Sequence, residues 1–185
     1  MPVFVLLLRG VNVGRARRVP MADLRALLGD LGHRRVATLL NSGNAVFHAA
    51  RGGAAAHGQA IGAAIAERFG FEVPLVVKAA ADLDRIVAAN PLHFDVEAHA
   101  RVLVVFANSA AALRELAPIG TLVEAPEAFH VGAHAAYLHC AHGILASRAA
   151  AALLGRAGAA LTTRNWATVL KLQALAHQAG RAAKA

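Results

Sequence analysis

The sequence predicts an α+β protein made of a ferredoxin-like β-α-β-β-α-β half followed by a second, looser half of the same kind with extra helices. Two observations predict it. Short apolar runs of strand length alternate with segments whose apolar residues recur at helical spacing. This order of strands and helices occurs once in residues 1–79 and is repeated in residues 80–185. We therefore expect two α+β subdomains with these boundaries, and a closing helix over 163–179 that packs near the first.

The first half contains four predicted strands and two predicted helices. Pro20 suits the first turn of a helix, and the leucines after it recur at i, i+3, i+4 and i+7. Ser42-Gly43 is typical of a turn between paired strands. Gly32 and Gly70 end the two helices. The predicted strands are 3–9, 36–41, 44–49 and 73–78.

The second half repeats the order with an added helix at each end. Helix 80–89 ends at Asn90-Pro91, and Ser109 and Ser147 are predicted N-caps of two later helices. The helix that Ser109 begins is expected to stop at Pro118. The remaining predicted elements are strand 101–107, a hairpin of 127–132 and 135–141, helix 147–154, strand 159–162 and the closing helix 163–179.

Composition narrows the class of partner. The chain has 185 residues, of which 57% are hydrophobic and 16% charged, with a net charge of +8. This excess of positive charge favours acidic partners such as nucleotides, nucleic acid or anionic metabolites. No apolar run approaches the roughly 20 residues that span a bilayer. The single cysteine excludes an internal disulfide and fits a reducing compartment, so we expect a cytoplasmic protein.

The first polar motif is the loop Arg9-Gly10-Val11-Asn12-Val13-Gly14-Arg15, which directly follows a strand. Glycine lets backbone N–H groups approach an anion closely, and Arg17 and Arg18 add positive charge. The loop has neither the Gly-Lys-Ser/Thr of a Walker loop nor the spacing GxGxxG. Two interpretations stay open: an anion-binding loop, or a turn in which glycine provides positive φ and the arginines are solvated.

The second motif is the turn Asn41-Ser42-Gly43-Asn44. It places several polar groups at one end of a sheet, where they could contact a ligand. The alternative is a hairpin turn whose asparagines bond the nearby backbone.

The third motif is TTRNWATVLKL, Thr162 to Leu172, which holds the only tryptophan. Thr162 or Thr163 is predicted to cap the closing helix. The helix is expected to carry a polar stripe on one face and apolar residues that pack inward on another. The stripe consists of Arg164, Thr168 and Lys171, and the inward residues are Trp166, Val169 and Leu170. The stripe would either clamp an anion or bond the carbonyls of a neighbouring loop.

Other chemistries lack a recognisable pattern. No carboxylate lies within the three motifs, so acid–base hydrolysis by a carboxylate pair has no support, and no Gly-x-Ser-x-Gly elbow occurs. Histidines surround Cys140 without zinc-ligand spacing, so we expect no metal and no cofactor. Cys140 itself is predicted to be an inert core residue. The strands lack the aromatic pattern of an RNA-recognition sheet.

The three motifs in this order resemble a bacterial family, domain of unknown function 1697. The stretches LRGVNVG, LNSGNAVF and TTRNWATVLKL carry the resemblance, together with Asn90-Pro91 and Tyr137-Leu138. The chain departs from the family pattern at Arg15, Ala167 and Arg148, where a glycine, a polar residue and a lysine are usual. The resemblance implies an α+β fold with a ferredoxin-like part and implies no activity.

We therefore expect a cytoplasmic module that binds a small anionic ligand, a nucleotide or a carboxylate, where the three motifs meet. The alternatives are a metal-independent transferase that uses the same groups, weak nucleic-acid binding through the net charge, and motifs that only hold the fold together. Whether the protein is an enzyme and how it assembles are not predicted. The candidate ligand-binding residues are Arg9, Asn12, Gly14, Ser42, Asn44, Arg164, Asn165, Thr168 and Lys171.

Overall fold

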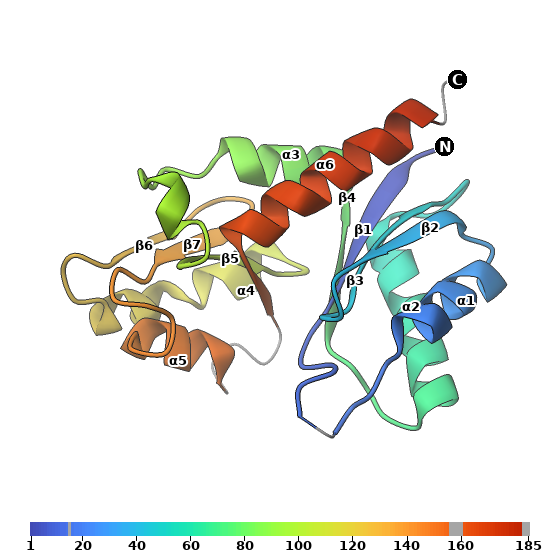
Figure 1. The fold of residues 1–185 in the computed structure, drawn as a ribbon, viewed down its shortest axis with the longest axis horizontal. Helices are drawn as coiled ribbons and strands as arrows, with labels where there is room; N and C mark the ends of the chain where they lie inside the picture. Colours follow the sequence, from blue (N-terminus) through green and yellow to red (C-terminus); the bar gives the residue numbers. More distant parts are fainter. Residues whose placement is uncertain (15, 156–160, 183–185) are drawn as a thin grey trace. The chain divides into compact units, whose positions relative to one another are not determined.

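The chain forms two compact units, shown in the computed structural model in Figure 1. The structure describes residues 1–14, 16–155 and 161–182. The first unit comprises Met1–Leu83 together with the chain from Leu172 onward, and the second comprises Asp84–Lys171. None of the described helices is both long and apolar enough to cross a bilayer.

The first unit is built on a four-stranded antiparallel sheet with the strand order β2-β3-β1-β4. Two helices connect its strands in the order β-α-β-β-α-β, as the sequence predicts. The elements are β1 (Val3–Leu8), α1 (Met21–Asp30), β2 (Arg34–Leu39), β3 (Asn44–His48), α2 (Ala54–Phe69) and β4 (Leu75–Ala79).

The second unit repeats this architecture with the strand order β6-β7-β5-β8. Its elements are η1 (Val96–Ala98), β5 (Val102–Phe106), α4 (Ala110–Arg114), η2 (Ala117–Leu122), β6 (Ala128–Val131), β7 (Ala136–His139), α5 (Arg148–Leu154) and β8 (Thr162–Asn165). Helices α3 (Ala80–Ala88) and α6 (Trp166–Ala182) follow β4 and β8 directly. The predicted fold class, two similar antiparallel α+β halves, is therefore confirmed.

Side chains of the central strand β1 point alternately to the two faces of the sheet, and one of these faces carries the core of the first unit. Phe4, Leu6 and Leu8 of β1 point to the face that α1 and α2 cover in Figure 1. Leu24 of α1 and Ile61 of α2 are fully buried against them. A strand exposes every second side chain to the same face, so β1 dictates which helix faces must be apolar.

The core of the second unit follows the same rule. Leu103 and Val105 of β5 pack with Leu138 of β7 against α4 and α5. Tyr137, the next residue back on β7, points to the opposite face, is fully buried, and donates its hydroxyl to the carbonyl of Ile86 in α3 at 2.7 Å. Burial raises the pKa of Tyr137 to about 12. The hydroxyl is therefore a neutral donor that fixes α3 against this face of the sheet.

The sequence predicts the N-caps of α4 and α5 correctly, but it predicts the end of α4 wrongly. Ser109 accepts a hydrogen bond from Ala112 N at 3.2 Å, and Ser147 accepts one from Ala150 N at 3.1 Å. The helix after Ser109 ends at Arg114, before the predicted stop. Pro118 lies inside the 3₁₀ helix η2, because proline suits the first turn of a new helix as well as the end of an old one.

Three histidines of the first unit each bury one ring nitrogen. The ring of His33 stacks on Phe47 at 4.3 Å between centroids and meets His57 edge-on at 5.0 Å. The Nε2 atoms of His33, His48 and His57 are buried without a hydrogen-bond partner among the described residues. Burial, then the charge of His57, lowers the pKa of His33, and burial, then the charge of Arg35, lowers that of His48.

These histidines predict an acid-sensitive first unit. Because the folded-state pKa of His33 and His48 lies below the unfolded value, the unfolded chain binds more protons between the two values. Stability is therefore full above the ordinary histidine pKa of about 6.5 and falls as the pH drops below it. Unfolding at pH 7.5 and pH 5.5 measures the effect. His33→Phe, which keeps the stacked ring, should reduce the difference, whereas exposed His134→Gln should leave it unchanged; an equal difference in both variants would contradict the assignment.

Candidate functional site

The glycine-containing loop after β1 is fixed by the side chain of Asn12. Its Nδ2 donates to the carbonyls of Asn41, at 2.7 Å, and Val19, at 2.8 Å, and its Oδ1 accepts from Val19 N at 2.9 Å. The backbone of Asn12 is left-handed, with φ of 59°, which asparagine tolerates better than other non-glycine residues. Asn12 therefore ties both ends of the loop together and joins it to the hairpin turn.

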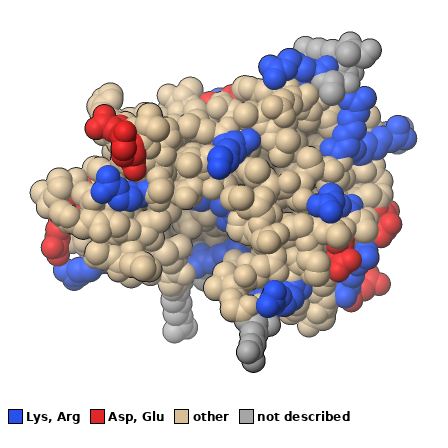
Figure 2. All heavy atoms as spheres, viewed as in Figure 1, with Lys and Arg blue, Asp and Glu red and all other residues tan. Residues whose placement is uncertain are grey.

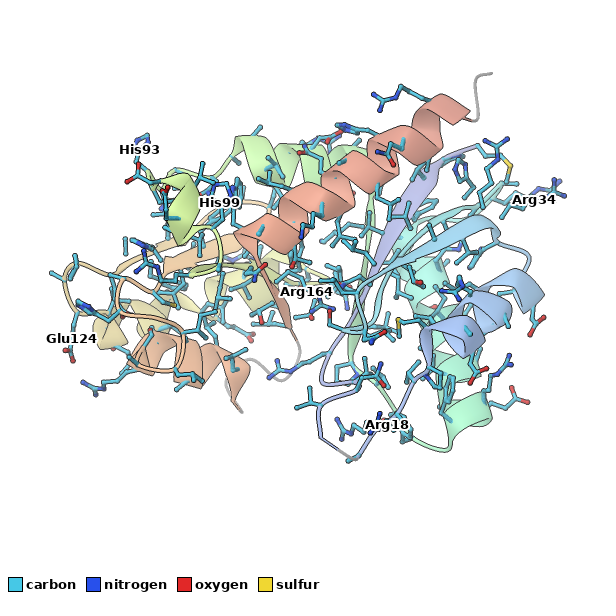
Figure 3. The ribbon with its side chains drawn as sticks, viewed as in Figure 1. Arg18, Arg34, His93, His99, Glu124 and Arg164 are labelled. Carbon is cyan, nitrogen blue, oxygen red and sulfur yellow. The ribbon has the colours of Figure 1, made fainter. Side chains whose placement is uncertain are left out.

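The loop presents positive charge around a backbone that turns repeatedly. Gly10 and Gly14 have φ of 64° and 62°, the left-handed region that glycine adopts without strain. Arg17 and Arg18 are exposed, and Figure 3 labels Arg18 just before α1. Partial burial lowers the pKa of Arg9. Arg15, the last residue of the predicted motif, lies outside the described residues.

The hairpin turn lies beside this loop, so the first two motifs meet within the first unit. Asn44 is fully buried, and its Nδ2 donates to the Leu39 carbonyl at 3.0 Å and to Ser42 Oγ at 2.9 Å. Gly43 accepts from Leu8 N at 2.8 Å. The asparagine therefore bonds the nearby turn, as the second interpretation of this motif expects, while Ser42 stays exposed at the surface.

The third motif differs from the sequence prediction, because TTRN is a strand and not the start of a helix. Residues Thr162–Asn165 form β8, which pairs antiparallel with β5. The predicted strand residues 159 and 160 lie outside the described residues. Helix α6 starts at Trp166, so Arg164 shares no helical stripe with Thr168 and Lys171. Thr162 and Thr163 do not cap the helix, because both lie in β8 and α6 starts only at Trp166.

Asn165 takes over the capping role. Its Oδ1 accepts a hydrogen bond from Thr168 N at 2.9 Å, the contact expected of an N-cap residue at the start of α6. Thr168 is buried and Lys171 is exposed on the helix. Trp166 is buried, as predicted, and its ring meets Phe94 edge-on at 5.7 Å between centroids.

Arg164 is a half-buried cation that neighbouring groups of β8 hold in place. Its Nη1 donates to Thr162 Oγ1 at 2.9 Å and to the Thr163 carbonyl at 2.7 Å. Burial lowers its pKa to about 10. Figure 3 labels the side chain beside β8. Arg164 pairs with Val104 in the sheet, so it lies on the face turned away from α4 and α5. The protein thus holds a half-buried guanidinium at a defined place on β8.

Sequence reasoning missed Lys78, which occupies the equivalent place in the first unit. Lys78 of β4 pairs with Val5 of the central strand, as Arg164 of β8 pairs with Val104. Each cation stands two residues before the helix that follows its strand directly, α3 after β4 and α6 after β8. Burial lowers the pKa of Lys78 and nearby Asp82 opposes that effect. A lone cation at the end of the apolar run VPLVVK was the available signal.

The other charged groups and the possible metal ligands are dispersed over the described residues. Among the described residues, no group of three or more His, Cys, Asp or Glu side chains could hold a metal ion. Cys140 is buried, and burial raises the pKa of its thiol to about 11. Figure 2 shows the described lysines and arginines of the visible face in separate groups, without a continuous stripe.

Comparison with known proteins identifies the family. The sequence model of the family described as "Protein of unknown function (DUF1697)" matches residues 1–137. The chain belongs to this family. In this DUF1697 protein the loop of Asn12 and the hairpin turn lie inside the matched residues, and Arg164 lies beyond them.

A solved structure shows the same fold. The conserved bacterial protein SP0830 from Streptococcus pneumoniae superposes with a TM-score of 0.78 at 23% sequence identity. The alignment covers 93% of this chain and 97% of that one. At this identity the similarity establishes the fold alone. No curated protein matches the chain significantly in sequence.

Proposed function

We propose that this DUF1697 protein binds a small anionic ligand, a nucleotide or a carboxylate, with Arg164 as the principal cation. The observation that supports this proposal most is the burial of the Arg164 guanidinium. Burial lowers its pKa to about 10 and so disfavours the charged form. A bound anion would favour the charged form and offset that cost. Arginine presents its donors in a planar fork that matches carboxylate and phosphate oxygens.

The residues around Arg164 support the proposal by orienting it. Thr162 and Thr163 hold Nη1, and the pairing of β8 with β5 fixes the backbone that carries the side chain. A guanidinium oriented before the ligand arrives loses less entropy on binding. Asn165 and Thr168 contribute by fixing the start of α6.

The basic loop of the first unit is a separate candidate place for an anion, considered by itself. Arg9, Arg17 and Arg18 provide positive charge, and Gly10 and Gly14 let the backbone turn so that N–H groups can reach an anion. We assign Asn12 to positioning this loop, because its amide is already engaged in three hydrogen bonds. Ser42 on the neighbouring turn stays a candidate contact.

A thermal-shift panel of AMP, ATP, inorganic phosphate and citrate tests the proposal. A ligand at a hundred times its Kd stabilises the native state by about 2.7 kcal/mol, which raises Tm by several degrees. Arg164→Gln should abolish the ligand-induced shift relative to its own unliganded Tm. Arg114→Gln removes the same charge from an exposed site on α4 and should keep the shift. Equal shifts in the two variants would remove Arg164 from the site.

Nucleic acid is the second candidate ligand, favoured by the net charge of +8 and the exposed Arg17 and Arg18. Such binding would weaken steeply as salt increases, because phosphate contacts release counterions. Fluorescence anisotropy of a labelled oligonucleotide at rising salt measures it. A metal-independent transferase that uses the same groups stays an alternative, which product formation from a bound nucleotide would distinguish.

A further inference from the structure

A pocket of 470 Å³ lies in the first unit, apart from the residues considered so far. One wall consists of Pro2 and Val3 at the start of β1. Another consists of residues 79–81, where β4 passes without a loop into α3. The C-terminal half of α6 supplies the third wall. Its volume falls within the roughly 300–1,000 Å³ that small-molecule sites occupy.

The pocket exists because the side chains around it are small. Three consecutive alanines, residues 79–81, line it together with Ala176 and Gly180 of α6. A Cβ atom added at Gly180 would meet no atom within 4 Å, so the space beside this glycine is open. The walls made by these residues are apolar, and they suit the aliphatic or aromatic body of a ligand.

The charged group that lines the pocket is a cation. Arg181 and His177 stand four residues apart, on the same side of α6. Arg181 is exposed, and none of the ion pairs among the described residues involves it. The lining residues include no Asp or Glu.

We propose that this pocket binds a small monocarboxylic acid with an apolar body. The body lies against Pro2, Val3 and the alanines, and the carboxylate pairs with Arg181. A neutral apolar molecule would leave Arg181 unpaired by the ligand, and a hydrophilic anion would leave the apolar walls unused. The pocket therefore favours a ligand that has both an apolar body and a carboxylate. The pocket and the Arg164 site rest on different residues and different ligands, so either proposal can fail while the other stands.

Calorimetric titration with octanoate, and with octanol as the uncharged analogue of equal chain length, tests the pocket. The full-length protein should bind octanoate saturably and more tightly than octanol. Arg181→Gln should weaken octanoate roughly fivefold, the effect of one solvent-exposed ion pair, and leave octanol unchanged. Arg114→Gln should change neither.

Gly180→Leu fills the pocket and provides a variant that does not depend on charge. Leucine is a better helix former than glycine, so this variant should fold. It should lose binding of both octanoate and octanol. Undiminished octanoate binding by Gly180→Leu, equal affinities of the wild type for octanoate and octanol, or no saturable binding at millimolar octanoate would each overturn the proposal.

Discussion

Gly43→Ala is expected to lower the free energy of unfolding by about 2–5 kcal/mol. The backbone of Gly43 has φ of 73°, which costs an alanine roughly 1–2 kcal/mol. A Cβ atom there would lie 2.6 Å from Leu8 Cβ and 2.7 Å from Val11 Cγ2, both of which are buried. Relieving this overlap by shifting the core costs a further 1–3 kcal/mol or so. Urea unfolding monitored by circular dichroism measures the loss.

Gly70→Ala is the matched control for this prediction. Gly70 ends α2 with a similar φ of 76°, and a Cβ atom added there meets nothing within 4 Å. Its replacement should therefore cost only the conformational strain, about 1–2 kcal/mol. Equal losses at the two glycines would mean that the close approach of the turn to Leu8 and Val11 does not exist in solution.

Asn12→Ala should destabilise the protein by about 2–4 kcal/mol. The change removes three hydrogen bonds, each worth about 1 kcal/mol net, and replaces asparagine in a left-handed conformation. The loop should then separate from the hairpin turn and become sensitive to proteolysis. Unfolding in urea and limited digestion measure the two effects.

Asn41→Ala provides the control for Asn12, because the hydrogen bond from Asn12 reaches the backbone carbonyl of Asn41 and not its side chain. The exposed amide of Asn41 can be removed with a loss below about 0.5 kcal/mol. If Asn12→Ala were as stable as Asn41→Ala, Asn12 would not be a clamp, and its role as a ligand contact would regain support.

Local chemistry explains why most of the fold could be predicted. Ser42-Gly43 specifies a tight turn by itself, and Ser109 and Ser147 cap helices through bonds to residues three positions later. The short continuous apolar run VFVLLL indicates a buried strand without knowledge of its partner. The strand order follows because the connections in each half are those of one known topology.

The start of α6 could not be placed from sequence because its residues suit two structures. Threonine is favourable both as an N-cap and in a strand. Pairing with β5 decides between them, and that partner lies about sixty residues earlier in the chain. The same limit applies to Asn12, whose bond to Asn41 spans 29 residues. Polar motifs can be found by composition, but only the fold shows which atoms they satisfy.

Calorimetric titration of the strongest ligand from the panel tests most directly whether Arg164 binds an anion, as we propose. The titration is run on the wild type, Arg164→Lys, Arg164→Gln and Arg114→Gln. We predict unchanged affinity for Arg114→Gln, weaker binding for Arg164→Lys, which keeps the charge without the planar fork, and no measurable binding for Arg164→Gln. Equal affinity in all four proteins would contradict the proposal that Arg164 binds the anion.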